Sequence, residues 1–216
     1  VIIVSGGNIQ RDFALDFLQK NKKENVCLIA ADKGVEFFIK TDWVPDVAVG
    51  DFDSLSAAGE KYLDSLKETE IVRLKPEKDD SDTQSAVNFA IDRGAKNITI
   101  FGATGNRIDH LLANFGLLVL GRERGTDIIL IDQWNYMKLV ESGTVLKKKE
   151  QFGKYVSFFS LEGDMPGLTL VGFKYPLDHY HLRVSDSGLT VSNEIEAEEA
   201  VVSFDGKSLL MLMTRD

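Results

Sequence analysis

The sequence predicts an α/β lobe followed by an all-β sandwich lobe, and two patterns support that prediction. From residue 1 to about residue 132, short β-branched runs alternate with amphipathic stretches of helical period. After residue 132, β-rich runs are spaced by Gly, Asp and Ser turns, with no convincing helix between them. We therefore expect two domains, over residues 1–132 and 133–216.

The first lobe should be a parallel sheet covered by helices on both faces, because strands and helices alternate along it. The expected strands lie at 1–7, 26–32, 47–53, 70–75, 97–103 and 127–132. The expected helices lie between them, at 11–21, 34–42, 57–68, 82–94 and 107–125. Sheets of this Rossmann-like kind bind ligands beyond the carboxyl ends of their strands, so polar residues that follow a strand form the candidate site.

The second lobe should be an antiparallel sandwich or a partial barrel. Its expected strands lie at 136–141, 155–162, 168–173, 200–204 and 208–214. This lobe has no acidic cluster of its own, so the chemistry is expected in the first lobe.

The composition narrows the possible classes of function. A chain of 216 residues with 44% hydrophobic residues can bury a substantial core. Its 34 acidic and 25 basic residues give a net charge of −9, which repels a nucleic-acid backbone or an anionic membrane. The one cysteine, Cys27, lies in an apolar run, and no apolar run reaches the length of a bilayer span. We expect a cytoplasmic protein with no nucleic-acid partner and no membrane association.

The strand at 47–53 ends in two aspartates, Asp51 and Asp53. Residues two apart on an extended chain point the same way, so both carboxylates could bind one hard cation such as Mg²⁺. Asp also closes strands as an ordinary turn residue, and a D-x-D pattern alone does not decide between the two interpretations. A third aspartate, Asp46, lies at the start of the same strand.

The segment EKDDSDTQ follows the next strand, and helix initiation explains part of it. Ser81 and Gln84 form the pattern of a capping box, and Asp82 in the first turn suits the helix dipole. Helix initiation does not explain Asp79 and Asp80. A second arm of the same metal site is the better interpretation of these carboxylates.

The segment FGATGNRIDH joins a strand to the longest expected helix. Gly102 and Gly105 permit a tight turn whose free N–H groups could bind a phosphate at the helix start, and Arg107 adds a positive charge. The segment is not a P-loop, because the G-K-[ST] ending is absent. A glycine turn alone needs no function, whereas Arg107 together with Asp109 favours one.

Asp32, Lys33 and Gly34 form another turn after a strand, where they could touch a nucleotide or lie in solvent. His110, beside Asp109, could face the same crevice. The three histidines and the one cysteine do not have the spacing of a zinc site. The turn SGGN is not a G-x-G-x-x-G fingerprint, so a dinucleotide-binding oxidoreductase has little support.

Carboxylates gathered at strand ends repel a polyphosphate unless a divalent cation neutralises them. With Mg²⁺ bound, the same carboxylates hold the ion that neutralises the phosphates. An acidic crevice with one arginine therefore indicates metal-assisted phosphoryl transfer, in which positioning and charge neutralisation supply most of the rate.

The ordered set PDVAVGDFDS, KDDSDTQ and GATGNRIDH resembles the bacterial thiamine pyrophosphokinase family. In the second lobe, YVSFFSLEG, GLTLVGFKYPL, GLTVSNE and SLLMLMTRD are similar to that family's carboxyl-terminal half. The likeness covers nearly the whole chain, and the order of the motifs makes it specific. It implies an α/β lobe paired with a β-sandwich lobe. It also implies transfer of a diphosphate group, as one unit, from ATP to the hydroxyl of thiamine, with release of AMP.

The resemblance further implies roles for individual residues. The ligands of Mg²⁺ would be Asp51, Asp53 and Asp82. Catalysis would fall to Asp51, Arg107 and Asp109. ATP would be bound by Asp32, Lys33, Gly34, Thr104, Gly105, Asn106 and Arg107. Thiamine would meet Asp46, Asp79, His110, Ser192 and Asn193.

The resemblance also implies a homodimer whose thiamine site lies between subunits, with Ser192 and Asn193 reaching across from the second lobe. From the sequence alone this pair is an ordinary turn. The preceding segment, 179–191, is less glycine-rich than the family pattern suggests, so the course of that loop is not predicted.

Two other functions fit parts of the pattern. A metal-dependent nucleotidyl or glycosyl transferase could use the same D-x-D motif, but it would release a different leaving group. A non-catalytic protein that binds thiamine would form no AMP, although Arg107 and the carboxylates argue against it. The nucleotide product distinguishes the three functions.

Overall fold

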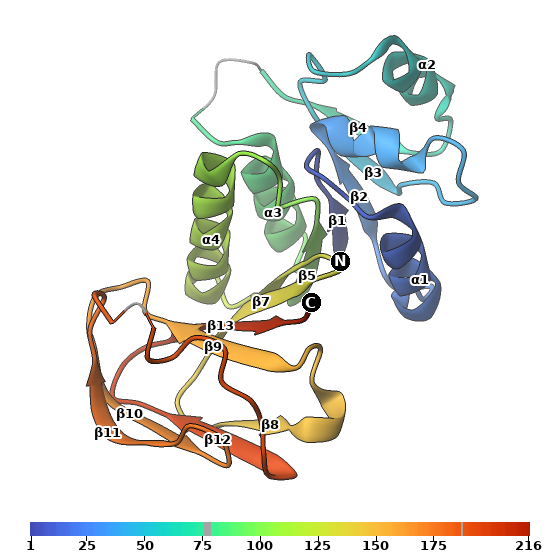
Figure 1. The fold of residues 1–216 in the computed structure, drawn as a ribbon. Coiled ribbons are helices and arrows are strands. Elements are labelled where there is room, and N and C mark those ends of the chain that lie inside the picture. Colours follow the sequence, from blue (N-terminus) through green and yellow to red (C-terminus); the bar gives the residue numbers. More distant parts are fainter. Residues whose placement is uncertain (76–78, 187) are drawn as a thin grey trace. The chain divides into compact units, whose positions relative to one another are not determined.

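The computed structural model describes residues 1–75, 79–186 and 188–216 (Figure 1). The chain forms two compact units, Val1–Gln133 and Trp134–Asp216. Among the described residues, every α-helix belongs to the first unit.

The first unit alternates strands and helices, as the sequence predicts. Its strands are β1 (Ile2–Val4), β2 (Leu28–Ala31), β3 (Val47–Gly50), β4 (Glu70–Arg73), β5 (Asn97–Phe101) and β6 (Asp127–Ile131). Its helices are α1 (Arg11–Asn21), α2 (Ala57–Ser65), α3 (Asp82–Asp92) and α4 (Ile108–Glu123), with a short 3-10 helix η1 (Asp32–Phe38).

The strands of this unit pair in parallel, in the order β4-β3-β2-β1-β5-β6. In the central strand β1, Ile3 pairs with Ile29 of β2 on one side and with Ile100 of β5 on the other. All three side chains are buried, as in strands covered on both faces. Because β2 to β4 lie on one side of β1 and β5 and β6 on the other, the carboxyl ends of β1 and β5 lie at a topological switch point. Such sheets bind ligands at that point.

The helix expected at 34–42 is a shorter 3-10 helix, η1, that begins at Asp32. Gly34 lies so close to β1 that a Cβ there would be 1.9 Å from the Val4 carbonyl oxygen. Phe37 and Phe38 are both buried, with their rings edge to face and 5.1 Å between centroids. Val35 is buried as well, so most of this short helix packs into the core.

The second unit consists of strands, with one short 3-10 helix among its described residues, η2 (Lys148–Glu150). Its strands are β7 (Asn135–Val140), β8 (Thr144–Lys147), β9 (Tyr155–Phe159), β10 (Met165–Val171), β11 (Leu177–Leu182), β12 (Glu199–Ser203) and β13 (Leu209–Thr214). They pair antiparallel in two sets, β7-β13-β9 and β11-β10-β12-β8. Both sets contribute to one apolar core, for example through Phe158, Leu168, Val202 and Met211.

The sequence does not predict two of these strands, β8 and β11. Both lie at an edge of their sheet. Lys147 in β8 and Asp178 and His179 in β11 break the apolar pattern. Edge strands often carry charged residues that discourage pairing with other chains, so the periodicity that identifies strands is weak there.

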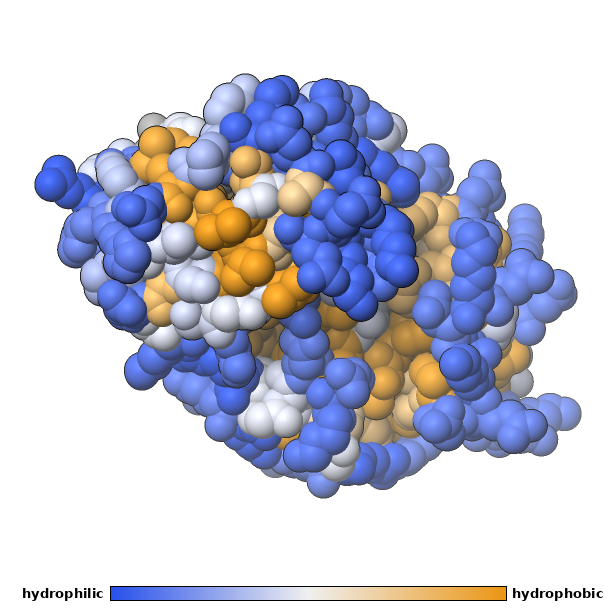
Figure 2. All heavy atoms as spheres, turned by 90° about the horizontal axis from the view of Figure 1, so that it is seen from below, coloured by the Kyte–Doolittle hydropathy of each residue, from blue (hydrophilic) through white to orange (hydrophobic). Residues whose placement is uncertain are grey.

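The outer side of the four-stranded sheet carries a row of valines. Val171 of β10 pairs with Val201 of β12, which pairs with Val145 of β8. Figure 2, which views the molecule from below the orientation of Figure 1, shows apolar residues set among hydrophilic ones on the face it draws. Cross-strand valine pairs stabilise such a sheet, and scattered exposed valines are normal.

The predicted fold class, an α/β unit followed by an all-β unit, is confirmed. Among the described residues there is no helix long and apolar enough to cross a membrane.

Candidate active site

Glycine-containing turns pack backbone against backbone at the carboxyl edge of the parallel sheet. The Gly7 N–H donates to the Gly102 carbonyl at 3.0 Å, and a Cβ on Gly102 would lie 2.3 Å from the Ser5 carbonyl oxygen. A Cβ on Gly50 would lie 2.9 Å from the Cα of Asp32. The turns that follow β1, β2, β3 and β5 therefore come together only because glycine occupies these positions.

The turn after β3 brings Asp51 and Asp53 together, although not by the geometry that the sequence suggests. Phe52 between them has a φ of 63°, so the chain is not extended there. The Phe52 ring is buried, and the Arg73 guanidinium lies 5.5 Å from its centroid. The Asp53 N–H donates to Asp51 Oδ1 at 3.3 Å. A tight turn anchored by Phe52, and not an extended strand, sets the two carboxylates side by side.

Asp32 joins these two carboxylates in one acidic cluster. Asp32, Asp51 and Asp53 each offer a carboxylate oxygen, and the three oxygens lie within 4.8 Å of one another. Ser54 donates to Asp32 Oδ2 at 2.5 Å, whereas Asp32 Oδ1 is buried without a hydrogen-bond partner. Three close carboxylates and one unsatisfied buried oxygen form a donor set that suits a hard divalent cation.

The electrostatics of Asp53 also place Asp82 near the cluster. The charge of Asp51 raises the pKa of Asp53 above its ordinary value, and burial and the charges of Asp32 and Asp82 add to the rise. Asp82 is not among the three carboxylates within 4.8 Å, so the grouping differs from the predicted set of Asp51, Asp53 and Asp82. Asp32, which the sequence assigns to the nucleotide, takes the closer position.

The loop before α3 is fastened by Asp80. Its two carboxylate oxygens accept hydrogen bonds from Gln84 Nε2 at 2.6 Å and Asn88 Nδ2 at 3.1 Å. Ser81 caps the helix by accepting from the Gln84 N–H at 3.2 Å, so one half of the predicted capping box is present. The Gln84 side chain goes to Asp80 in place of closing the box. Asp79, the residue before Asp80, is exposed. Lys78, the first residue of the KDDSDTQ motif, lies outside the described residues.

Arg107 is the N-cap residue of α4, and its side chain is paired with Asp109. The guanidinium donates to Asp109 Oδ1 at 3.1 Å and to Oδ2 at 2.5 Å, with both side chains largely exposed. These bonds lower the pKa of Asp109 to about 2 and raise that of Arg107. His110 is also exposed, and its N–H donates to Asp109 Oδ1. The pair is charged throughout the physiological range.

The turn before Arg107 is held by residues that the sequence does not single out. Thr104 Oγ1 donates to Asp132 Oδ2 at 2.6 Å, and Asn114 of α4 donates to the Ala103 carbonyl at 2.8 Å. Asp132 follows β6, so it reaches the turn from the neighbouring strand. The sequence feature that could have identified Asp132 is its position directly after a strand. Gly105 and Asn106 complete the turn.

In the second unit, Ser192 and Asn193 lie beside β9. Ser192 is exposed and has a φ of 57°, and its N–H donates to Ser157 Oγ at 2.9 Å. Asn193 is 1% exposed, and its side chain is hydrogen bonded to the backbone of Tyr175. Only Ser192 of the pair is accessible to a ligand.

Comparison with known proteins now identifies the family. Residues 18–130 match the family model described as thiamin pyrophosphokinase, catalytic domain, and residues 143–209 match the thiamin pyrophosphokinase vitamin B1 binding domain. Thiamine pyrophosphokinase of Bacillus subtilis (strain 168) is 33% identical over 193 residues, which is 89% of this chain and 89% of that protein. The chain belongs to the thiamine pyrophosphokinase family.

Solved structures of thiamine pyrophosphokinases have the same fold. The crystal structure from Bacillus subtilis has a TM-score of 0.87 at 31% identity and covers 100% of this chain and 98% of its own. The structure from Geobacillus thermodenitrificans has a TM-score of 0.84 at 30% identity, with coverages of 100% and 97%. The predicted family is confirmed, as is the enzyme class, a transferase with thiamine diphosphokinase activity.

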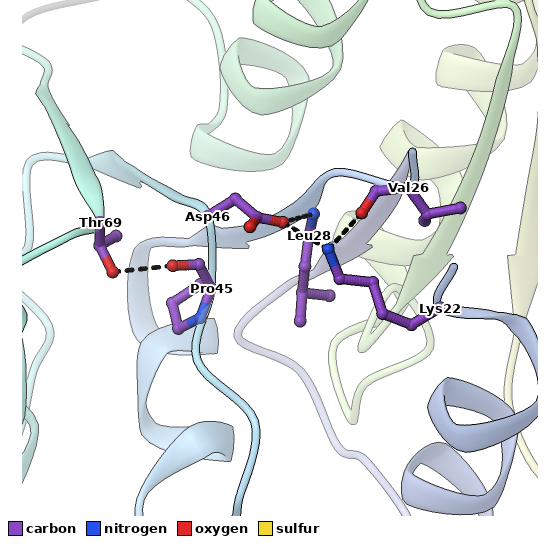
Figure 3. A network of polar contacts seen from close by, with 6 residues as sticks. All are labelled: Lys22, Val26, Leu28, Pro45, Asp46 and Thr69. Carbon is purple, nitrogen blue, oxygen red and sulfur yellow. Dashed lines mark hydrogen bonds and ion pairs between the residues drawn. The ribbon is translucent and has the colours of Figure 1, made fainter. Parts of the chain in front are cut away.

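Asp46 lies at the opposite edge of the sheet from this family's carboxylate motif. It precedes β3, whereas Asp51 follows it, and a four-residue strand separates its two ends by roughly 13 Å. Asp46 Oδ2 accepts from the Leu28 N–H at 2.7 Å and from Lys22 Nζ at 2.8 Å, and Lys22 also donates to the Val26 carbonyl (Figure 3). These bonds favour a fastening role for Asp46 over the predicted contact with thiamine.

We predict that Asp46→Ala destabilises the protein without changing its turnover. The substitution leaves the Leu28 N–H and the Lys22 ammonium without their shared acceptor, which should cost about 1–2 kcal/mol. Asp16→Ala is the matched control, since Asp16 makes only an exposed pair with Lys20, worth less than about 0.5 kcal/mol. Urea unfolding measures both variants. A folded Asp46→Ala enzyme with greatly reduced turnover would return Asp46 to the active site.

Proposed function

We propose that this thiamine pyrophosphokinase acts at the carboxyl edge of the parallel sheet in its first unit. The hydroxyl oxygen of thiamine attacks the β-phosphorus of ATP, and the bond from that phosphorus to the oxygen that stays on the α-phosphate breaks. AMP leaves, the hydroxyl proton is released, and thiamine diphosphate is formed. The observation that supports this location is the cluster of Asp32, Asp51 and Asp53, which lies between glycine turns at the carboxyl ends of β2 and β3.

We assign Mg²⁺ to this cluster. Asp51 and Asp53 supply the predicted carboxylates, Asp32 adds a third, and Asp82 contributes charge from the start of α3. The raised pKa of Asp53 and the unsatisfied oxygen of Asp32 both support a role for a cation, because each reflects negative charge without compensation. When bound, Mg²⁺ would neutralise phosphate charge that these carboxylates otherwise repel.

We assign Arg107 to the migrating diphosphate. An exposed ion pair contributes little stability, so Arg107 can exchange Asp109 for phosphate oxygens without a large energetic cost. Asp109 keeps the guanidinium beside the start of α4 until the substrate binds. The α4 N-terminus and the turn before it present N–H groups that suit the ATP phosphates. We place Thr104, Gly105 and Asn106 there, with Lys33 and Gly34 on the neighbouring turn. Asp79 and His110, both exposed, are assigned to thiamine.

We further propose that the chain forms a homodimer and that Ser192 contributes to a thiamine site shared between subunits. The exposed stripe of α4 supports a dimer. Ile108 is 71% exposed and Leu112 is 62% exposed. Gly116 lies on the same stripe, and a Cβ added to it would have no atom within 4 Å. A helix that is apolar on its outer as well as its inner side is typically covered in the assembled protein.

The nucleotide product tests the reaction. Protein incubated with ATP, Mg²⁺ and thiamine should form AMP and thiamine diphosphate in equal amounts, and excess chelator should abolish turnover, because the acidic edge cannot accept a triphosphate alone. Omission of thiamine is the control. ADP as the product would indicate a single phosphoryl transfer. Thiamine binding without any nucleotide product would indicate a binding protein.

Asp53→Asn and Arg107→Ala should differ in their response to Mg²⁺. Asp53→Asn removes a charge from the ion's site, so the Mg²⁺ concentration for half-maximal AMP formation should rise about tenfold, and added Mg²⁺ should restore part of the rate. Arg107→Ala should lower kcat by about 100-fold, and Mg²⁺ should not restore it. Superimposable Mg²⁺ curves for Asp53→Asn and the parent would remove Asp53 from the metal site.

A stability measurement separates these effects from misfolding. Since neighbouring charges raise the pKa of Asp53, the folded state carries repulsion when Asp53 is ionised. Metal-free Asp53→Asn should therefore unfold at or above the temperature of the metal-free parent at pH 7. The difference should shrink as the pH falls toward 3.8, the ordinary pKa of the group.

Leu112→Glu should shift the protein from dimer to monomer and weaken thiamine binding. A charge on the α4 stripe cannot be buried against a second copy without a large desolvation cost. Val44→Glu is the matched control, since Val44 is 55% exposed on a loop away from α4. Sedimentation velocity gives the oligomeric state. If the parent is a monomer that binds thiamine, the dimer proposal fails.

A further inference from the structure

We propose that Asn193 is a positioning residue that holds Ser192 in place for thiamine and does not itself touch the substrate. This inference rests on the proposed function, in which Ser192 contributes to the thiamine site. The side chain of Asn193 is 1% exposed, whereas Ser192, the preceding residue, is exposed. The pair that the sequence presents as one motif is therefore divided between the surface and the interior.

The Asn193 amide is occupied at both ends. Its Oδ1 accepts from the Tyr175 N–H at 3.0 Å and from the Glu194 N–H at 2.9 Å, and its Nδ2 donates to the Tyr175 carbonyl at 2.8 Å. Two backbone N–H groups that point at one end of the amide fix that end as the oxygen. The Asn193 side chain thus bonds both backbone groups of Tyr175, as the backbone of a neighbouring strand would. An aspartate lacks the donor and a leucine lacks both groups, so neither can form the two bonds.

The backbone of the same residue is fastened on its other side. The Val156 N–H of β9 donates to the Asn193 carbonyl at 2.7 Å, and the Asn193 N–H donates to the Val156 carbonyl at 3.0 Å. Asn193 therefore bridges β9 and the turn after β10, which holds Tyr175. These bonds hold the backbone of Asn193 in one place. The position of Asn193 in turn restricts where the preceding residue, Ser192, can lie.

Ser192 has a conformation that needs such support. Its φ of 57° is left-handed, which costs a non-glycine residue about 1 kcal/mol or more. Two anchors hold it directly: the Ser192 N–H is bound by Ser157 Oγ, and Asn193 follows. Thr190, two residues earlier, is tied separately to Phe158 by its backbone carbonyl and its hydroxyl. The side chain of Ser192 is left at the surface in a fixed place, as a group that must meet a ligand requires.

The test compares Asn193→Asp with Thr190→Val and Ser192→Ala. Thr190 is the matched control, because it is also 1% exposed and also anchors this segment to β9, but it lies two residues before Ser192. Asn193→Asp removes the donor to Tyr175 and places an acceptor against an acceptor. It should raise the KM for thiamine by about tenfold, as Ser192→Ala should, with the KM for ATP unchanged. Thr190→Val should lower the unfolding temperature by a similar amount and leave the thiamine KM within about twofold of the parent.

Each outcome decides a separate point. If Ser192→Ala raises the thiamine KM but Asn193→Asp changes it no more than Thr190→Val does, Asn193 is only structural and the inference is overturned. If neither Ser192→Ala nor Asn193→Asp changes the thiamine KM while AMP is still formed, Ser192 lies outside the thiamine site and the inference falls with it, but the diphosphotransferase reaction stands.

A second variant keeps the inference testable if Asn193→Asp does not fold. Ser157→Ala removes the acceptor of the Ser192 N–H from the β9 side without touching Asn193. It should also raise the thiamine KM selectively, because it releases the same left-handed residue. An unchanged thiamine KM in Ser157→Ala would show that the fixed position of Ser192 does not matter for binding and would overturn the inference.

Discussion

Close contact between backbone turns at the carboxyl edge of the parallel sheet is the constraint on which the candidate site depends. Gly34 lies against the Val4 carbonyl, Gly102 against Ser5 and Gly50 against Asp32, each with less room than a Cβ requires. Ordinary residues at these positions would separate the turns. The carboxylates at the ends of β2 and β3 would then move apart, since Asp32 begins η1 directly after β2 and Asp51 follows β3 without a spacer. Glycine at the turns and aspartate at their tips are therefore two parts of one arrangement.

This arrangement works against the stability of the protein without a bound cation. Like charges meet within 4.8 Å, the pKa of Asp53 is raised and one Asp32 oxygen lacks a partner in the interior. Two non-glycine residues in this region, Asp32 and Phe52, also have positive φ. The surrounding structure imposes these unfavourable features: Phe52 is buried against Arg73, and Ser54 binds Asp32. Unfavourable charge and backbone strain that coincide at one edge are typical of a site made for a ligand.

The sequence predicted the alternation of strands and helices, the change to strands alone near residue 132 and the closeness of Asp51 and Asp53. It did not predict Asp32 as their nearest neighbour, because contacts between turns depend on strand order, which periodicity does not give. The strands β8 and β11 were missed because edge strands need no apolar alternation. The place of Asp46 could have been read from the sequence: in a parallel sheet, a residue before a strand lies at the opposite edge from one after it. The burial of Asn193 could not have been foreseen, since its partner, Tyr175, is distant in the sequence.

The helix α4 connects the proposed chemistry with the proposed dimer. It begins directly after Arg107, and its first residue, Ile108, is one of the most exposed apolar side chains in the described chain. Ile108 and Leu112 form the stripe that we assign to a second copy, and Arg107 and Asp109 flank Ile108. If a second subunit covers that stripe, water is excluded next to the guanidinium, and the lower local dielectric strengthens its attraction for phosphate oxygens. Assembly and the binding of phosphate by Arg107 are in this way linked at one helix start. A monomer would keep the acidic cluster but would present Arg107 to its substrate in water, where a single charge is least effective.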